Sequence, residues 1–400
     1  MHITDEIKAY ALQLGFCKIG VTNAQKYDRV LAEAVARGGY DYWLDRFRQG
    51  SDPKILMPDA KSVIVLAYDY ARCHFPENLL PMIGRAYLSR SYSPQPGSAV
   101  HRMLMQFENC LKEKGIRYVT GNELLVRPAA EQAGVTSFGK NNFAYVDGVG
   151  SFIILYGYIV DKALEYDPPF TGSRCPPKCR ACIDACPTHA LYAPFKLDPE
   201  KCIGYNNWMR HAGRINDLVI PREIRPQMDR HIHGCDLCQE ACPRNKRKLA
   251  AEYPKDALLE DIGRRFRLQD LLHMPEGFYE KCVHPIMYNY IRDKKVFQRN
   301  AAVAIGNTQD PAYIPDLIAE LSNPDAVIRL HVVWALGQMD DPAARRALYD
   351  RIQIEASPAV IHEIKMALAA ETNEIHESRF QCDQNRAGFT HRYKNAVRKD

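Results

Sequence analysis

The sequence predicts an α+β multidomain fold, and three patterns in its 400 residues support that prediction. Helix and strand patterns alternate up to about residue 165, eight of the 13 cysteines lie between residues 175 and 242, and a helical repeat follows residue 295. We therefore expect an N-terminal α/β domain over residues 1–165, a cysteine-rich domain over 166–250, a connector over 251–295, α-helical HEAT-like repeats over 296–370 and a basic tail over 371–400.

The composition is that of an ordinary globular protein. Hydrophobic residues make up 46% and charged residues 25%, and the net charge of +5 is modest for this length. The longest apolar stretch, Gly148–Val160, is too short to span a bilayer. The first residues, Met1–Glu6, lack the basic and then apolar layout of a secretory signal, so we expect a cytoplasmic protein with no membrane partner.

The N-terminal domain contains helix and strand patterns in turn. Ile7, Ala11 and Leu14 recur at helical spacing behind a predicted N-cap at Thr4. The stretch Ser62–Ala67 is rich in β-branched residues, which predicts a strand buried on both faces of a sheet. Further strands are expected at Cys17–Val21, at Ile116–Val119 and in the run ending at Val160, and a further helix at Ala99–Lys114.

The clustered cysteines fall into two runs that each end in the spacing C-x₂-C-x₃-C-P. The first run is Cys175, Cys179, Cys182 and Cys186, and the second is Cys202, Cys235, Cys238 and Cys242. In bacterial ferredoxins with this spacing, three cysteines bind one [4Fe–4S] cluster and the fourth binds its neighbour. Crossed ligation gives Cys175, Cys179, Cys182 and Cys242 to a first cluster, and Cys186, Cys202, Cys235 and Cys238 to a second. The sequence therefore predicts a bacterial ferredoxin-like double-cluster domain that transfers single electrons.

Zinc and disulfides are the competing interpretations of these cysteines. Structural zinc sites use closed sets of four with paired C-x₂-C knuckles, and neither run has that form. Disulfides need an oxidising compartment, and the sequence has no secretory layout. One departure from ferredoxin spacing is visible, because the gap Cys175-Pro-Pro-Lys-Cys179 holds three residues instead of two. Either Lys178 or a proline bulges outward, or Cys175 is not a ligand.

A repeat of about thirty residues follows the connector. Ala302–Gly306 is echoed by Val333–Gly337, Asp310-Pro311 is echoed by Asp341-Pro342, and Met366–Ala369 fits the start of a third unit. Two amphipathic helices per unit predict a short solenoid of the HEAT type. Such a solenoid either presents a face to a macromolecule or caps the connector, and the sequence leaves both roles open.

The order of these parts resembles the epoxyqueuosine reductase family over nearly the whole chain, to about residue 370. The strongest local matches are Cys182–Thr188, Lys201–Tyr205, Pro221–Pro226, Gly234–Pro243 and Arg299–Asn307. The resemblance implies two [4Fe–4S] clusters, a cobalamin held by the N-terminal α/β corrinoid-binding domain, and reduction of epoxyqueuosine to queuosine in tRNA.

Glycine-containing segments of the N-terminal domain resemble the family's region around the corrinoid. Phe138-Gly139-Lys140-Asn141 precedes Gly150-Ser151; glycines let a backbone approach a flat macrocycle, and Lys140 and Asn141 can donate to its amide side chains. Asp229–Gly234 spells D-x-H-x-x-G, a loop in which some cobalamin proteins supply a histidine below cobalt, but the neighbouring strand and helix are missing. The resemblance implies cofactor contacts at Arg127, Gly139, Lys140, Asn141, Gly150, Ser151 and Tyr205.

Two departures from the family pattern affect the expected active site. The family's acid lies in an Asp-Ser-Ala-Pro-type stretch shortly before Leu-x-Arg; here Thr120 stands in that place, and Glu123 is the nearest carboxylate. Arg90–Ser93 stands where the family commonly has Arg-x-Asp-Tyr-His, and Tyr92 is retained. We therefore predict Tyr92 and Glu123 as the candidate catalytic proton donors.

Three functions remain open at this point. The first is reduction of epoxyqueuosine in tRNA, fed by an external one-electron donor such as ferredoxin or flavodoxin, and the repeats and basic segments favour it. The altered pocket favours the second, a related cobalamin and iron–sulfur reductase of the deoxygenase or dehalogenase type that acts on a small molecule. The third is an electron-transfer or corrinoid-reactivating protein, and the large N-terminal domain argues against it.

Overall fold

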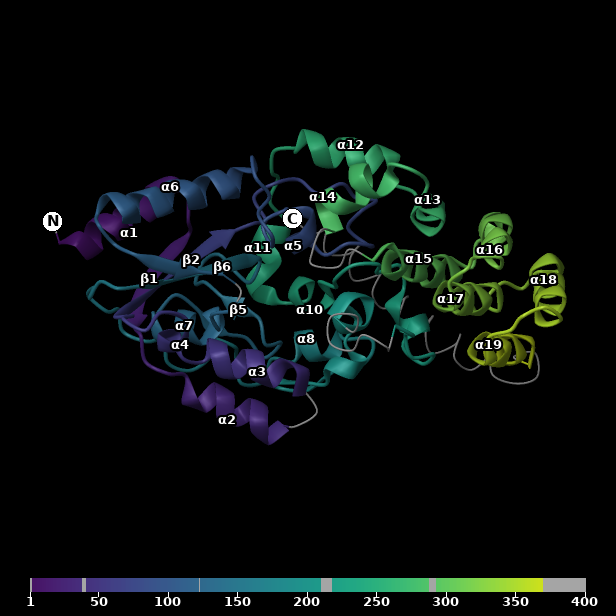
Figure 1. Cartoon of the computed structure of the whole chain (residues 1–400), viewed down its shortest axis with the longest axis horizontal. Helices are drawn as coiled ribbons and strands as arrows, with labels where there is room; N and C mark the ends of the chain where they lie inside the picture. The colour runs from purple at the N-terminus through teal and green to yellow at the C-terminus, as the bar shows by residue number, and fades with distance from the viewer. Residues whose placement is uncertain (1, 38–40, 122, 210–217, 288–292, 370–400) are drawn as a thin grey trace.

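The computed structural model describes residues 2–37, 41–121, 123–209, 218–287 and 293–369. The molecule is elongated, with a β-sheet and its helices at one end, a stack of helices at the other, and the cysteine-rich segment between them (Figure 1). The predicted α+β multidomain fold is therefore confirmed, and the order of the parts along the chain is kept in space.

Four strands form the sheet of the N-terminal domain: β1 (Lys18–Asn23), β2 (Ser62–Asp69), β3 (Tyr118–Thr120) and β6 (Ile153–Val160). Their order is β1-β2-β6-β3, and each neighbouring pair is antiparallel. β2 is buried along almost its whole length, as its β-branched composition predicts. Because the strands are antiparallel, this domain is α+β in class and has no doubly wound parallel sheet.

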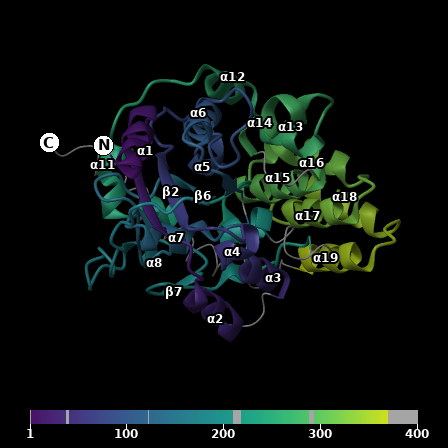
Figure 2. The same ribbon diagram turned by 60° about the vertical axis from the view of Figure 1, so that its left-hand side comes forward.

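Helices cover both faces of this sheet (Figures 1 and 2). α1 (Ile3–Leu14) and α6 (Ala99–Glu113) pack on the face to which Ile64 and Leu66 of β2 point. α7 (Val126–Gln132) packs on the opposite face, to which Val63 and Val65 point. Three more helices lie on the α7 side: α2 (Asp28–Arg37), α3 (Asp41–Gly50) and α4 (Pro53–Leu56).

Two local expectations in this domain are wrong. The N-cap of helix α1 is His2, two residues earlier than the predicted Thr4, so Thr4 lies inside the helix. The Thr4 hydroxyl group instead accepts a hydrogen bond of 3.1 Å from the backbone N–H of Glu165. The apolar run Gly148–Val160 is not a strand throughout, because Val146 and Gly150 close a tight turn and β6 starts only at Ile153.

The cysteine-rich domain contains short elements, since metal ligands rather than long ladders determine its fold. Around it lie α5 (Arg85–Leu88) and two small hairpins, β4–β5 and β7–β8. The hairpin strands are β4 (Ser137–Phe138), β5 (Ala144–Tyr145), β7 (Leu191–Ala193) and β8 (Lys196–Leu197). The short helices are α8 (Ala181–Asp184), η1 (Pro199–Lys201), η2 (Tyr205–Met209), η3 (Arg225–Met228), α10 (Leu237–Glu240), η4 (Pro243–Asn245) and α11 (Lys246–Leu249).

The connector packs into the same hydrophobic core as its neighbours. Its elements are α12 (Ala257–Arg265), α13 (Leu268–His273), η5 (Tyr279–Val283) and α14 (His284–Met287). Leu272 and Met287 from the connector share one buried cluster with Phe152 of the N-terminal domain and Phe297 of the repeats. The chain therefore has a continuous core from the edge of the sheet to the repeats.

The predicted repeat units form a helical stack (Figure 2). Their elements are α15 (Lys294–Thr308), η6 (Pro311–Tyr313), α16 (Ile314–Glu320), α17 (Ala326–Leu336), α18 (Pro342–Ile352) and α19 (Pro358–Ala369). The repeated glycines mark close helix contacts: a Cβ added at Gly306 would lie 2.8 Å from the Cα of Ala335, and one at Gly337 would lie 2.7 Å from the Cβ of Ala367. The repeated Asp-Pro pairs are N-caps, because Asp310 and Asp341 each accept a backbone N–H two residues on.

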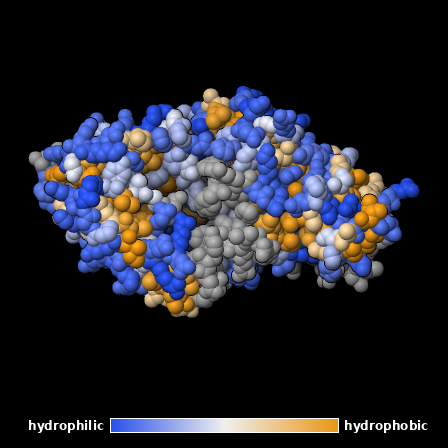
Figure 3. Space-filling model, viewed as in Figure 1, coloured by the Kyte–Doolittle hydropathy of each residue, from blue (hydrophilic) through white to orange (hydrophobic). Residues whose placement is uncertain are grey.

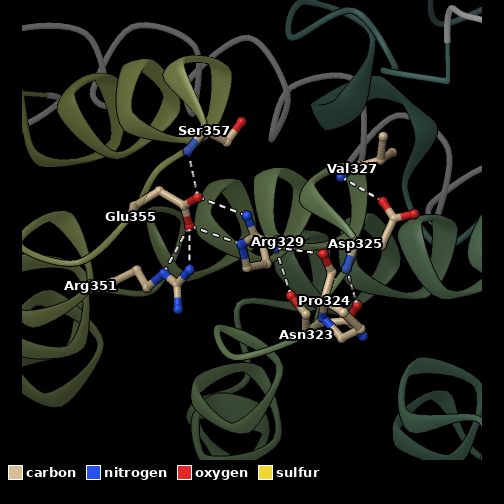
Figure 4. Close-up of polar contacts among 8 residues, drawn as sticks. All are labelled: Asn323, Pro324, Asp325, Val327, Arg329, Arg351, Glu355 and Ser357. Carbon is tan, nitrogen blue, oxygen red and sulfur yellow. Dashed lines mark hydrogen bonds and ion pairs between the residues drawn. The ribbon is translucent and has the colours of Figure 1, made fainter.

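A buried carboxylate joins two of these repeat helices to the turn that follows them (Figure 4). Glu355 accepts hydrogen bonds from Arg329 at 2.7 Å, from Arg351 at 2.6 Å and from the backbone N–H of Ser357 at 2.9 Å. The hydrogen bond from Arg329 is the largest cause that lowers the pKa of Glu355 to about 2, although burial opposes it. Glu355 is therefore ionised at neutral pH.

Within the described ranges, no helix combines the length and apolar character that a membrane crossing requires. The face drawn in Figure 3 is mostly hydrophilic, with separate apolar patches near its two ends. The predicted basic tail over 371–400 lies outside the described residues.

Candidate iron–sulfur and cofactor site

The first group of cysteines brings together residues from both runs. The pKa of Cys182 is raised to about 11. Burial is the largest cause, and the nearby thiols of Cys242, Cys175 and Cys179 add to it. Cys242 therefore lies with the first run, although it belongs to the second run in sequence. Cys175 lies close to these cysteines despite its longer gap to Cys179.

The second group contains the remaining four cysteines. Burial, followed by the nearby thiols of Cys235, Cys202 and Cys186, raises the pKa of Cys238 well above its usual value. Crowded, buried thiols resist ionisation on their own, whereas coordination to iron stabilises the thiolate form. Two groups of four cysteines that exchange one member each have the donor sets that two adjacent [4Fe–4S] clusters require.

Lys140 contacts the loop of the first cluster group. It lies in the β4–β5 hairpin and is only 7% exposed. Its ammonium group donates to the backbone carbonyls of Pro176 at 2.8 Å, Pro177 at 2.7 Å and Cys179 at 2.9 Å. These three bonds use all three donors of the ammonium group, so none is left for the amide side chains of a corrinoid.

Asn141 contacts the second cluster group in the same way. Its side-chain N–H donates to the carbonyl of Cys238 at 3.1 Å and to the Tyr145 hydroxyl group at 3.0 Å. Burial, together with a hydrogen bond to Cys242, raises the pKa of Tyr145. Two consecutive residues of the N-terminal domain thus each hold the backbone of a different cluster motif.

Gly139, Gly150 and Ser151 also pack inside the protein. A Cβ added at Gly139 would lie 2.4 Å from the Tyr145 ring, and one at Gly150 would lie 2.3 Å from the side-chain oxygen of Asn245. Gly150 has a φ of 103°, which a side chain would also disfavour. Ser151 donates its backbone N–H to Asn245 at 2.9 Å. The close approach that these residues permit is between protein segments, not to a macrocycle.

The other two predicted cofactor contacts differ in exposure. Tyr205 is buried. Burial raises the pKa of Cys202, and hydrogen bonds from the backbone N–H groups of Tyr205 and Gly204 offset part of that rise. Arg127 is exposed and its guanidinium group lies 4.8 Å from the centre of the Phe138 ring. The guanidinium group also donates to the Asn142 carbonyl, and the surrounding protein lowers its pKa, so Arg127 contacts the β4–β5 hairpin, in contrast to Lys140, which contacts a cluster loop.

Tyr92 belongs to an aromatic group beside the second cluster. Its ring centre lies 5.4 Å from that of Tyr87 and 6.3 Å from that of Trp208. Tyr87 in turn lies 4.2 Å from His233, which directly precedes the Gly234-Cys235 segment. Tyr92 is 38% exposed, so its hydroxyl group is accessible to a substrate.

The D-x-H-x-x-G segment follows the short helix η3, where a cobalamin loop would follow a strand. The ring of His231 hydrogen-bonds the carbonyl of Met228 at 2.9 Å. His233 is fully buried among aromatic rings, and burial lowers its pKa to about 3. The sequence therefore indicated correctly that this motif lacks the context of a cobalamin loop.

Glu123 lies on a loop that is fixed to the end of α3. A Cβ added at Gly50 would lie 2.0 Å from the Glu123 carbonyl oxygen, and the Leu125 N–H donates to the Gly50 carbonyl at 3.1 Å. The Glu123 side chain is exposed. Thr120, which stands where the family has its acid, donates its hydroxyl hydrogen to the Gly157 carbonyl at 2.7 Å.

The two candidate proton donors approach the sheet from opposite faces. The Tyr156 hydroxyl group of β6 donates at 2.5 Å to the carbonyl of Ser91, next to Tyr92. The following strand residue, Gly157, lies against Leu124, next to Glu123. Adjacent residues of a strand face opposite sides. The structure therefore brings Tyr92, but not Glu123, into contact with the aromatic group beside the second cluster.

Sequence reasoning missed the polar residues that join the domains. Arg85 is 7% exposed and donates to the carboxylates of Asp236 and Glu240. Asn300 of α15 donates to the carbonyls of Asn207 at 2.7 Å and Ile232 at 2.9 Å, beside the second group of cysteines. Asp236 and Asn300 lie within the matched segments, but their residue types alone indicate no partner.

The fold and the two cysteine groups define an iron–sulfur protein with two [4Fe–4S] clusters and HEAT repeats. Two family models match these parts: the 4Fe-4S double cluster binding domain matches residues 174–245, and HEAT repeats match residues 289–369. The first match supports two clusters in the cysteine-rich segment, and the crossed assignment of single cysteines stays a prediction.

Likeness to known proteins extends over almost the whole chain. Epoxyqueuosine reductase from Bacillus subtilis is 29% identical over 383 residues, covering 92% of this chain and 95% of the relative, and that from Escherichia coli is 27% identical over 390 residues, covering 92% and 97%. A crystal structure of epoxyqueuosine reductase with an epoxyqueuosine-modified tRNA-Tyr stem loop has a TM-score of 0.78 at 27% identity, covering 91% of this chain and 97% of that one. The chain is therefore a homologue of these epoxyqueuosine reductases over almost its whole length.

Proposed function

We propose that this protein is a cobalamin-dependent iron–sulfur oxidoreductase that reduces epoxyqueuosine to queuosine in tRNA. The observation that supports this most strongly is the crossed grouping of the eight cysteines inside a fold shared end to end with epoxyqueuosine reductases. Removing the epoxide oxygen as water takes up two electrons and two protons. The protein must therefore deliver electrons and position a proton donor.

Electrons enter at the first cluster in this proposal. Pro176, Pro177 and Lys178 are exposed between two of its cysteines, so the cluster lies directly beneath the surface. Arg174 and Arg180 are exposed nearby. A basic surface of this kind attracts an acidic one-electron carrier such as ferredoxin or flavodoxin.

The N-terminal domain has the task of holding the reacting groups. When bound, cobalamin supplies low-potential cobalt chemistry for the removal of the epoxide oxygen. Arg127 is the predicted contact that supports its binding, because its guanidinium group lies on the N-terminal domain over the Phe138 ring and beside the Asn142 carbonyl. Tyr92 is the better placed proton donor, since it adjoins the second cluster group, and Glu123 is the alternative on the other face.

The tRNA backbone would contact basic side chains of the connector. Arg264 and Arg265 pair with Asp261, and Arg267 pairs with Asp270 at 2.7 Å. These pairs are exposed, and exposed ion pairs contribute only about 1 kcal/mol or less. Phosphates can therefore compete with the carboxylates for the arginines, with a binding affinity that falls as salt rises.

A second function is favoured by one observation. Thr120 stands where the family has its acid, and its hydroxyl group is bonded to the sheet. A change in the proton donor is compatible with a related reductase that acts on a free small molecule. Turnover of a free substrate without tRNA would support that function.

Complementation tests the main proposal. The gene is expressed in an Escherichia coli strain that lacks its epoxyqueuosine reductase, and tRNA nucleosides are quantified by mass spectrometry. We expect queuosine to replace epoxyqueuosine, and a Cys202→Ser variant to leave epoxyqueuosine in place. Persistence of epoxyqueuosine despite soluble, cluster-loaded protein would reject the tRNA function.

A further inference from the structure

The cluster loop with the unusual gap is held by one buried side chain. Between Cys175 and Cys179 the chain has three residues, of which Pro176 and Pro177 have no backbone N–H. The carbonyls of Pro176, Pro177 and Cys179 converge on the ammonium group of Lys140 at 2.7 to 2.9 Å. The three-residue gap thus directs backbone carbonyl groups towards Lys140, and a gap of two residues would contain one carbonyl group fewer.

Lys140 matches these acceptors in number and is fixed at its own backbone. An ammonium group has three N–H donors, and each meets one carbonyl. The Lys140 carbonyl accepts the Phe195 N–H at 2.9 Å, which ties the hairpin to the β7–β8 turn. Lys140 therefore reaches the loop from a different domain without freedom to move away.

Among the described residues, the ammonium group of Lys140 forms no ion pair with a carboxylate, and its three hydrogen bonds all go to carbonyl oxygens. A buried charge is costly unless an opposite charge lies close by. A [4Fe–4S] cluster with four thiolates is net negative in both of its usual oxidation states, and it becomes more negative on reduction. The first cluster would supply such a charge, because Cys179, whose carbonyl accepts from Lys140, is one of its predicted ligands.

We propose that Lys140 is a positioning residue for the first cluster. Its hydrogen bonds shape the three-residue gap so that Cys175 and Cys179 reach the same cluster. Its charge stabilises the reduced form of that cluster. Local charge and hydrogen bonding are known determinants of cluster potential. This inference rests on the cluster assignment but not on the identity of the substrate.

The test is an anaerobic potentiometric titration followed by electron paramagnetic resonance, with iron analysis of each variant. In Lys140→Met we expect the reduction potential of one cluster to become more negative while that of the other is unchanged. If the first cluster is instead lost, the iron content should fall from about eight to about four irons per chain. Lys140→Gln keeps hydrogen-bond donors without the charge and is expected to retain both clusters with the same selective negative shift.

Lys178→Met is the matched control, because Lys178 lies in the same loop but is exposed to solvent. It removes an equal charge, and solvent screening should leave both potentials unchanged. The proposal is overturned if Lys140→Met keeps about eight irons at unchanged potentials, if both clusters respond equally, or if Lys178→Met produces the same shift. If the variants shift the cluster potentials as expected but the parent protein does not reduce epoxyqueuosine in tRNA, that result would count against the proposed function alone.

Discussion

Ser151 and Asn245 exchange two hydrogen bonds across the boundary between the N-terminal and iron–sulfur domains. The Ser151 N–H donates to the Asn245 side-chain oxygen at 2.9 Å, and the Asn245 side-chain N–H donates to the Ser151 hydroxyl oxygen at 2.8 Å. Asn245 follows Cys242 by three residues and is fully buried. The pair therefore ties the start of β6, an inner strand of the sheet, to the segment that follows a predicted ligand of the first cluster.

Asn245→Asp tests this tie. The substitution keeps the shape but removes the two side-chain N–H donors to Ser151 and to the Gln239 carbonyl, and it buries a charge. We expect a loss of about 1–3 kcal/mol in the free energy of unfolding, measured by urea denaturation. Asn109→Asp is the control, because Asn109 is exposed on α6. Equal stability of the two variants would contradict the role of the pair.

Serine variants of the cysteines test crossed ligation. If Cys242 belongs to the first cluster, Cys242→Ser and Cys175→Ser should leave the same residual electron paramagnetic resonance spectrum and about four irons per chain. Cys235→Ser should leave a different spectrum. Cys17→Ser, outside both groups, should keep about eight irons. A match between Cys242→Ser and Cys235→Ser would show that each run holds its own cluster.

Conservative variants distinguish the two candidate proton donors. Tyr92→Phe keeps the ring contacts with Tyr87 and Trp208 but removes the acidic hydrogen, so we expect turnover to fall about 100-fold or more while tRNA binding persists. Glu123→Gln should have the smaller effect, because Glu123 lies on the other face of the sheet. Single-turnover rates measure both. Undiminished rates in both variants would reject the two assignments.

The buried carboxylate of the repeats gives a prediction about pH. The pKa of Glu355 is about 2 in the folded protein and about 4.5 when unfolded, so ionised Glu355 stabilises the repeats above pH 4.5. That contribution is lost as the pH falls from 4.5 towards 2. Glu355→Gln should therefore lower the midpoint of urea denaturation at pH 7. The difference in midpoint between this variant and the parent protein should become smaller below pH 4.5. Asp350→Asn, at an exposed position on α18 beside Arg351, should give no such trend.

Periodic and local features could be predicted from the sequence, whereas the partners of single polar residues could not. The β2 strand, the α6 helix and the repeats follow from residue patterns that persist over many positions. Lys140 and Asn141 have side chains that donate to any acceptor, so their residue types cannot distinguish a corrinoid amide from a carbonyl of a cluster loop. The same holds for Thr4, whose hydroxyl group suits an N-cap but bonds Glu165.

The hydrogen bonds from Asn300 of α15 to Asn207 and Ile232 limit how the molecule can be divided. A designer who wished to transplant the eight-cysteine unit into another scaffold would need to bring the first HEAT helix with it, or else replace the amide that supports its backbone. A nonsense mutation just before residue 294 would spare every ligand and yet leave those two carbonyls without their donor. Loss of α15 is therefore expected to destabilise the second group of cysteines, although it removes none of them.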